Sequence, residues 1–285
     1  MKEFGGKTAF VTGGASGIGL ALANAFGRAG MNVMIADIEQ SALDSALAAL
    51  RANGVNAKGL LCDVAQRASI RDAANATLDA FGKVHICCNN AGVGVIGPIG
   101  TVTERDWDWI IDVNLKGVIH GTEVFVPIIE SHGEGGHILN TASQAGIVTT
   151  PGREPYNAVK HAIVAMSEGW HGQLRSRGIG VSVLCPSAVR SRIGESARNR
   201  PDRYGSARPA ASQTVPNVFG GMMEPDVMAA RVVEAIRDDE LHIFTHPELK
   251  WQIEERFNRI LMAVDKAAAS PALAEHVKNN PPKRP

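Results

Sequence analysis

Short apolar runs alternate with segments of helical periodicity along most of the chain. The expected strands are 7–12, 32–36, 57–62, 84–88, 137–141, 179–185 and 241–244. The expected helices are 18–29, 41–52, 70–81, one or two helices within 104–130, 156–175, 226–237 and 249–264. Such alternation is typical of βαβ units with right-handed crossovers. The pattern therefore predicts a doubly wound, Rossmann-type α/β domain, with about seven parallel strands flanked by helices.

No linker or change in composition divides this pattern. We therefore expect a single domain over 1–270, including a C-terminal helix at about 247–265, and a flexible tail over 271–285. The stretch 187–225 lacks periodicity and contains four prolines, at 201, 209, 216 and 225. A segment of this length without periodicity is usually either disordered or a functional lid, and we expect a lid here.

Charge and composition narrow the classes of partner. The 285 residues carry 29 Lys and Arg against 29 Asp and Glu, so no net charge draws the chain toward nucleic acid or an anionic membrane. No window is apolar enough for a membrane span, and the N-terminus lacks the apolar stretch of a signal peptide. The four cysteines lie in apolar runs and are interpreted as buried, reduced thiols. A cytoplasmic protein with no metal site and with no nucleic-acid or membrane partner is expected.

A glycine-rich turn, Thr12–Gly19 (TGGASGIG), connects the first expected strand to the first helix. Gly13, Gly17 and Gly19 allow a tight turn and close approach of a pyrophosphate to the helix N-terminus. Asp37 ends the second strand, 18 residues beyond Gly19, where a carboxylate binds an adenosine ribose and repels a 2′-phosphate. The pattern favours NAD over NADP. The alternative is a purely structural turn, with Asp37 capping the following helix.

Tyr156 and Lys160 lie four residues apart, on one face of an expected helix. An ammonium near a phenol stabilises the phenolate, so we expect the pKa of Tyr156 to fall well below 10. Alone, such a pair is commonly a surface pair. However, Ser143 stands just past a strand end, as do Asn90 and Pro186. Because ligands bind outside the carboxyl ends of parallel strands, these residues are expected to converge on one crevice.

These residues, in this order and spacing, resemble the short-chain dehydrogenase/reductase family over about residues 4–245. The matching pieces are Thr12–Gly19, Asp37, Cys62-Asp63-Val64, Asn89–Gly92 (NNAG), Asn114, Ser143, Tyr156–Lys160 (YNAVK) and Pro186. The resemblance implies an NAD(H)-dependent alcohol dehydrogenase or ketone reductase.

The resemblance also implies a role for each residue. Tyr156 would be the general acid/base, Ser143 would bind the substrate oxygen, Lys160 would hold the nicotinamide ribose, and Asn114 would anchor a water. Asp63 and Val64 would contact the adenine. The full set of expected cofactor-binding residues is Gly13, Ser16, Gly17, Ile18, Gly19, Asp37, Asp63, Val64, Asn90, Gly92, Lys160, Pro186, Val189 and Ser191.

Three features depart from the family pattern. Pro186-Ser187 replaces the usual Pro-Gly, Ser191 replaces a threonine, and about 40 residues follow the last expected strand. Within the family, the opening MKEFGGKTAFVTGGASG, Trp107–Gly121, Arg200–Gly205 and the C-terminal helix are similar to bacterial enzymes that oxidise benzylic secondary alcohols of lignin-derived aryl ethers. The alternatives are a 3-ketoacyl-thioester reductase, against which Asp37 argues, and a non-catalytic NAD-sensing regulator.

The lid and the flanking helices leave two questions open. Six arginines lie between 190 and 208; they are read either as solvated or, less readily, as a site for an acidic group. Several apolar residues could cover a bulky substrate or pack the lid on the core: Val215, Val218, Phe219, Met222 and Met223. The helices within 104–130 and 156–175 are expected to carry more apolar surface than one sheet face can cover, and the family pairs them between subunits. A homo-oligomer, either a tetramer or a dimer, is therefore expected.

Overall fold

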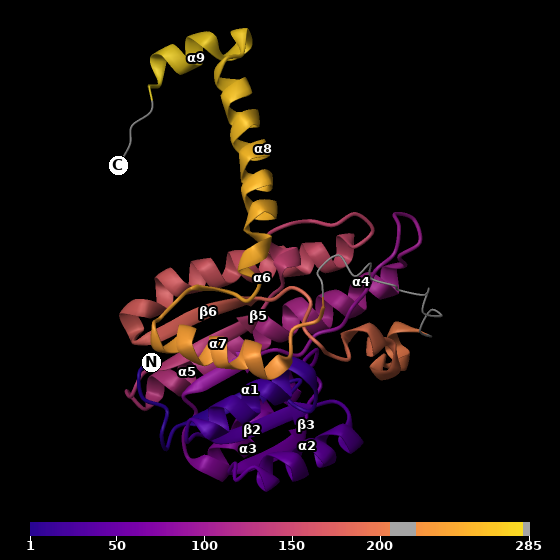
Figure 1. The fold of residues 1–285 in the computed structure, drawn as a ribbon, viewed down its shortest axis with the longest axis vertical. Helices are drawn as coiled ribbons and strands as arrows, with labels where there is room; N and C mark the ends of the chain where they lie inside the picture. The colour runs from indigo at the N-terminus through magenta and orange to yellow at the C-terminus, as the bar shows by residue number, and fades with distance from the viewer. Residues whose placement is uncertain (206–220, 282–285) are drawn as a thin grey trace. The chain divides into compact units, whose positions relative to one another are not determined.

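Seven parallel strands form the sheet that the alternating pattern predicts (Figure 1). The computed structural model describes residues 1–205 and 221–281. The strands are β1 (Thr8–Thr12), β2 (Asn32–Asp37), β3 (Ala57–Leu61), β4 (Ile86–Asn89), β5 (Gly136–Thr141), β6 (Ile179–Cys185) and β7 (His242–Phe244). Their order in the sheet is β3-β2-β1-β4-β5-β6-β7. The doubly wound Rossmann-type fold is thus confirmed, with element ends within about four residues of the expected ones.

The winding of the sheet reverses between its two central strands. Thr8 of β1 pairs with Asn32 of β2, whereas Ala9 of the same strand pairs with Ile86 of β4. The chain builds outward to β3, crosses back to β4 and then builds outward to β7. The loops after β1 and β4 therefore leave the sheet in opposite directions, which opens a crevice at their carboxyl ends.

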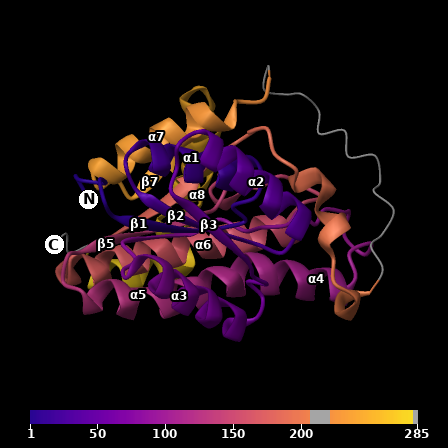
Figure 2. The ribbon, with the colours of Figure 1, turned by 90° about the horizontal axis from the view of Figure 1, so that it is seen from below.

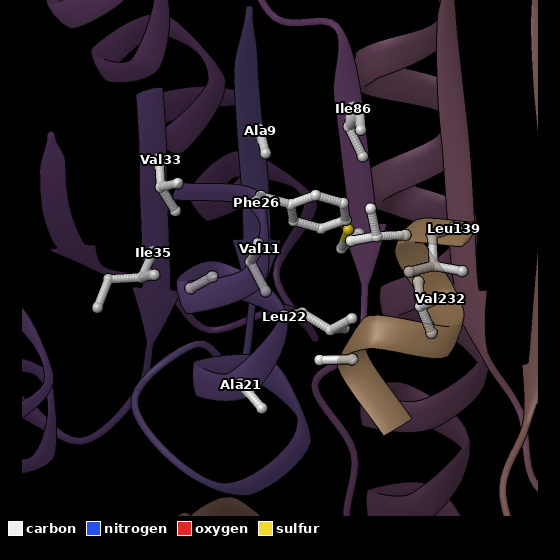
Figure 3. Packing of buried hydrophobic residues seen from close by; sticks show 14 of the residues in the cluster. Ala9, Val11, Ala21, Leu22, Phe26, Val33, Ile35, Ile86, Leu139 and Val232 are labelled. Atoms are coloured by element: carbon white, nitrogen blue, oxygen red, sulfur yellow. The ribbon is translucent and has the colours of Figure 1, made fainter. Parts of the chain in front are cut away.

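Helices cover both faces of the sheet (Figure 2). One face carries α1 (Gly17–Arg28), α2 (Gln40–Ala52) and α7 (Pro225–Arg237); the other carries α3 (Arg67–Phe81), α5 (Gly117–Ser131) and α6 (Glu154–Leu174). In Figure 3, Leu22 and Phe26 of α1 and Val232 of α7 lie over Val11 of β1 and Leu139 of β5. Burial of both faces explains why the strands read as continuous apolar runs rather than as alternating ones.

The helical stretch expected within 104–130 consists of three pieces. The first, α4 (Glu104–Ile110), begins at a capping box in which Thr103 and Asp106 exchange side-chain and backbone hydrogen bonds. A π-helical segment, η1 (Ile111–Lys116), joins α4 to α5. Such single-turn π segments cluster at functional sites, and this one contains Asn114.

The contacts within the chain divide it after Thr245. The second unit begins at His246 and contains α8 (Lys250–Ala268) and α9 (Ala274–Asn279). This differs from the expected single domain to residue 270, and α9 lies within the stretch expected to be a flexible tail. In the described part of the chain, no helix has the length and apolar character needed to cross a bilayer.

The lid segment begins after β6 and is partly described. Ala188 and Arg190 pair with Met223 through backbone hydrogen bonds of 2.8 and 3.0 Å, on either side of Val189. Two 3₁₀ helices follow, η4 (Ile193–Asn199) and η5 (Asp202–Tyr204). The apolar positions Val215, Val218 and Phe219, and Arg208, lie outside the described residues; Met222 is exposed.

All four cysteines are buried and free, as the apolar runs predict. Burial raises the pKa of the Cys62 thiol to about 11 and that of Cys185 to about 12. The pKa values of Cys87 and Cys88, which lie in the centre of the sheet, are raised well above the ordinary value. These thiols are structural, and none is an activated nucleophile.

Candidate active site

The glycine-rich turn is fitted closely to the loop after β4. Thr12 Oγ1 accepts hydrogen bonds from the backbone N–H groups of Asn90 and Ala91, at 2.9 and 3.0 Å, while Asn90 Nδ2 donates to Thr12 O. Gly13 has φ +62°, and a Cβ on Gly19 would lie 2.1 Å from the carbonyl oxygen of Gly13. Glycine is therefore required at both positions, and Asn90 acts by fastening the two loops.

The N-terminus of α1 at this turn is open to an anion. The side chain of Ser16, the N-cap residue, makes no capping hydrogen bond, and no acidic residue occupies the first turn. The first N–H groups of a helix need acceptors and carry the positive end of its dipole. The turn thus fits the pyrophosphate of a dinucleotide.

Asp37, at the end of β2, faces this turn. Its Oδ2 accepts a hydrogen bond from Ala15 N at 3.1 Å, and its Oδ1 accepts from Ile38 N and Glu39 N at 2.8 and 3.2 Å. The N-cap of α2 is Glu39, so Asp37 does not cap that helix. The carboxylate is instead held beside the glycine-rich turn, where it suits the hydroxyls of an adenosine ribose.

The structure brings Ser143, Tyr156 and Lys160 together at the carboxyl ends of β5 and β6. Tyr156 and Lys160 lie on the first two turns of α6, and the Lys160 ammonium lies 5.5 Å from the centre of the tyrosine ring. Lys160 is only 3 % exposed, and its Nζ donates to Thr141 O at 2.8 Å. Ser143 Oγ accepts from Ala145 N at 3.1 Å and donates to Pro186 O at 3.4 Å.

The protonation of these groups differs from the sequence-based expectation. Burial raises the pKa of Tyr156, whereas a hydrogen bond with Ser143 and the charge of Arg153 lower it. Burial also lowers the pKa of Lys160 to about 8. The expectation that Lys160 holds the pKa of Tyr156 well below 10 is therefore wrong for the chain without a bound cofactor. Desolvation of the phenolate outweighs the contacts that stabilise it.

Asn114 lies fully buried in the π-helical segment η1. Its Oδ1 accepts from Val93 N at 2.7 Å, and its Nδ2 donates to Val93 O at 2.9 Å. A Cβ on Gly92 would lie 3.5 Å from Asn114 Oδ1. The side chain of Asn114 therefore fixes the backbone of the loop after β4, next to the crevice.

The remaining predicted cofactor residues surround the same edge of the sheet. Val64 is buried after β3, and a Cβ on Gly17 would lie 3.0 Å from the Cβ of Ser191, which places the start of the lid beside α1. The Asp63 carboxylate accepts from Ala65 N at 3.0 Å and from Arg203 at 2.7 Å. The residue expected to contact adenine is thus also bonded to the lid.

Carboxylates of this chain neutralise the described lid arginines, a feature that sequence reasoning missed. The pairs are Arg190 with Glu224, Arg192 and Arg198 with Glu39, Arg200 with Asp106 and Arg203 with Asp63. The preferred reading of solvated arginines is wrong for Arg200, whose side chain is 5 % exposed. The sequence does show an excess of arginine over acidic residues in this loop. The four partner carboxylates could not be identified from it, because they are far away in the sequence.

Comparisons with known proteins agree with this fold. Residues 7–202 match the family model described as short chain dehydrogenase. The chain is 35% identical over 276 residues to the C alpha-dehydrogenase of Sphingobium sp. strain SYK-6, covering 95% of this chain and 90% of that protein. A short chain dehydrogenase/reductase from Burkholderia phymatum, solved in complex with NAD, has a TM-score of 0.88 and 38% identity, covering 92% and 97% of the two chains. LigO from Sphingobium sp. strain SYK-6, in its apo form, has a TM-score of 0.82 and 32% identity, covering 98% and 96%.

Proposed function

This chain belongs to the short-chain dehydrogenase family, and from that premise we propose that it is an NAD(H)-dependent oxidoreductase of secondary alcohols and ketones. The open N-terminus of α1 and the carboxylate of Asp37 support a cofactor without a 2′-phosphate. The similarity to a C alpha-dehydrogenase supports a bulky aromatic alcohol as substrate.

Each residue then has a chemical task. Bound nicotinamide supplies or accepts the hydride. Tyr156 Oη gives a proton to the substrate oxygen during reduction and removes it during oxidation, while the Ser143 hydroxyl orients that oxygen. The Lys160 ammonium holds the nicotinamide ribose and adds positive charge near the phenol. Asn114 would anchor a relay water, and the two bonds of its amide to Val93 hold it in place.

The observation that carries this proposal is the convergence of Tyr156, Ser143 and Lys160 at the strand ends that also hold the glycine-rich turn. The test is a screen of aryl and aliphatic secondary alcohols with NAD, followed by NADH absorbance. We expect turnover of aryl alcohols and little with NADP. Turnover of 3-ketoacyl thioesters with NADPH instead would support a lipid-synthesis reductase, and NADH binding without any turnover would support a regulator.

A further inference from the structure

Glu39, two residues beyond Asp37, binds lid residues across the cofactor crevice. Its Oε2 accepts from Arg198 Nε at 3.0 Å and from Asn199 Nδ2 at 3.2 Å, and Arg192 Nη1 lies 3.6 Å from its Oε1. The backbone N–H of Glu39 donates to Asp37 Oδ1. Glu39 therefore links the guanidinium groups of the lid to Asp37, whose carboxylate would face the ribose.

Arg198 does not depend on Glu39 alone for its position. Its Nη1 also donates to the carbonyl oxygens of Arg192 and Glu195, at 3.3 and 3.1 Å, within the lid itself. The side chain is 27% exposed. With the charge of Glu39 removed, the Arg198 guanidinium would stay in place as a free cation.

A free guanidinium at this end of the crevice would attract phosphate. Guanidinium groups form strong bidentate hydrogen bonds with phosphate oxygens. Hydrogen bonds from Asn199 and Arg198 lower the pKa of Glu39, so its carboxylate is charged throughout the neutral range. An ionised Glu39 thus neutralises the nearby cations and adds its own repulsion of a 2′-phosphate.

We propose that Glu39 is a second determinant of cofactor choice, which excludes NADP by occupying Arg198 and, more loosely, Arg192. This inference rests on the proposed NAD(H) function and extends it to a residue outside the glycine-rich turn and Asp37. Asp37 repels the 2′-phosphate directly, whereas Glu39 withholds the cations that would bind it. Specificity that arises from blocking the competing ligand is a general device in recognition.

The test compares two fragments that differ by one group, adenosine 5′-monophosphate and adenosine 2′,5′-bisphosphate, by titration calorimetry. We expect the wild-type chain to bind the monophosphate more tightly than the bisphosphate. Asp37→Ala should reduce this difference in affinity. Glu39→Gln alone should change the preference less than threefold, because Asp37 remains. The double variant should gain at least tenfold in bisphosphate affinity beyond the product of the single gains, a coupling of about 1.4 kcal/mol.

Two further variants assign that surplus. Adding Arg198→Gln to the double variant should abolish the surplus gain in bisphosphate affinity. A control double variant, Asp37→Ala with Glu195→Gln, should show no such surplus. Glu195→Gln removes the same charge from a residue that pairs with Arg192 at 3.2 Å but lies within the lid. Circular dichroism shows whether each variant is folded. Glu39→Ala, which also removes the carboxylate, serves as a second variant at this position.

The outcomes distinguish a failure of this inference from a failure of the proposed NAD(H) function. If neither the monophosphate nor NADH binds the wild-type chain, the proposed cofactor is wrong. If both bind, but the Asp37 and Glu39 effects are merely additive or the surplus survives Arg198→Gln, then Glu39 does not act through Arg198 and the inference is overturned.

Discussion

Tyr156 carries the proton in the proposed reaction, and the chain offers a matched control for its hydroxyl. Tyr156→Phe should lower turnover at least a hundredfold, because general acid–base catalysis supplies about 10²- to 10⁴-fold. NADH affinity, measured by fluorescence titration, should change little. Tyr204→Phe removes the other tyrosine hydroxyl, which donates to Asp112 at 2.8 Å, and should cost less than tenfold. More than a tenth of wild-type turnover in Tyr156→Phe, with chemistry rate-limiting, would refute the role.

At Lys160, the proposed function opposes stability. Its folded pKa of about 8 lies below the ordinary 10.5, so burial of the ammonium costs about 3 kcal/mol at neutral pH. Lys160→Met removes this cost and also the hydrogen bond to Thr141 O, which offsets about 1–2 kcal/mol. We expect the variant to lose activity at least a hundredfold and to unfold at higher urea concentration at pH 7.

The pH dependence of that difference has a definite sign. Between pH 8 and 10.5 the unfolded chain binds more protons at Lys160 than the folded one, so wild-type stability rises with pH in this window. Below pH 8 the burial cost is fully present. The stability advantage of Lys160→Met should therefore shrink as the pH is raised toward 10. A variant less stable than wild type at pH 7 would contradict the argument.

At the scale of single residues, the sequence predicts that the candidate site residues meet at one edge of the sheet, because they stand at fixed places relative to strand ends. Asp37 and Ser143 follow strands whose apolar runs are clear, and parallel pairing then brings them to one edge. The protonation of Tyr156 was not predictable in the same way, since it depends on how closely other side chains exclude water.

At the scale of elements, the strands and most helices were predictable because their apolar periodicity coincides with burial on the sheet. The π-helical turn η1 and the 3₁₀ helices η4 and η5 were not, because they follow no apolar period. The described part of the lid, residues 188–205, is held largely by ion pairs with carboxylates that are distant in the sequence. Such contacts exist only once the chain is folded.

The buried pair of Arg200 and Asp106 is expected to be the main anchor of η4 and η5. Arg200 Nη1 lies 2.5 Å from Asp106 Oδ1, both side chains are at most 5 % exposed, and the guanidinium lies 5.1 Å from the Trp109 ring. Removing one partner of a buried pair costs about 3–5 kcal/mol, because the other charge stays buried. Arg200→Met should thus sharply reduce the protection of residues 193–204 in hydrogen exchange.

A variant at an exposed lid pair provides the control for this anchor. Arg190 pairs with Glu224 at 2.7 Å, but both side chains are mostly exposed. Exposed pairs contribute about 0–1 kcal/mol, so Arg190→Met should leave the same protection nearly unchanged. Equal loss of protection in both variants would show that burial of the Arg200 pair does not hold the lid.

At the scale of the whole molecule, exposed apolar side chains support self-association. None of the large apolar residues of α5 or α6 is among the exposed ones, contrary to the expectation that these helices carry surplus apolar surface. In the described residues the surplus is concentrated in the second unit: Trp251, Phe257, Ile260, Leu261, Met262, Val264, Leu273 and Val277. Exposed apolar side chains in such number commonly mark a protein interface.

We therefore expect a homo-oligomer of this chain in which α8 takes part. Light scattering should show particles heavier than the 30.2 kDa chain at micromolar concentration. Phe257→Ser with Leu261→Ser should lower the measured mass, because both apolar side chains are exposed and lie one helical turn apart on α8. Particles of only 30.2 kDa in the wild type would refute the oligomer, and an unchanged mass in the variant would exclude α8 from the interface.

The four buried thiols also make this protein suited to spectroscopic labelling. Burial raises the pKa of all four thiols above the ordinary value, so alkylating dyes at neutral pH find neither an accessible sulfur nor a thiolate in the folded state. A cysteine introduced at an exposed lid position would then carry a fluorophore without prior removal of the native four. In the unmodified chain, the rate at which dye appears on protein would report how often the folded molecule opens.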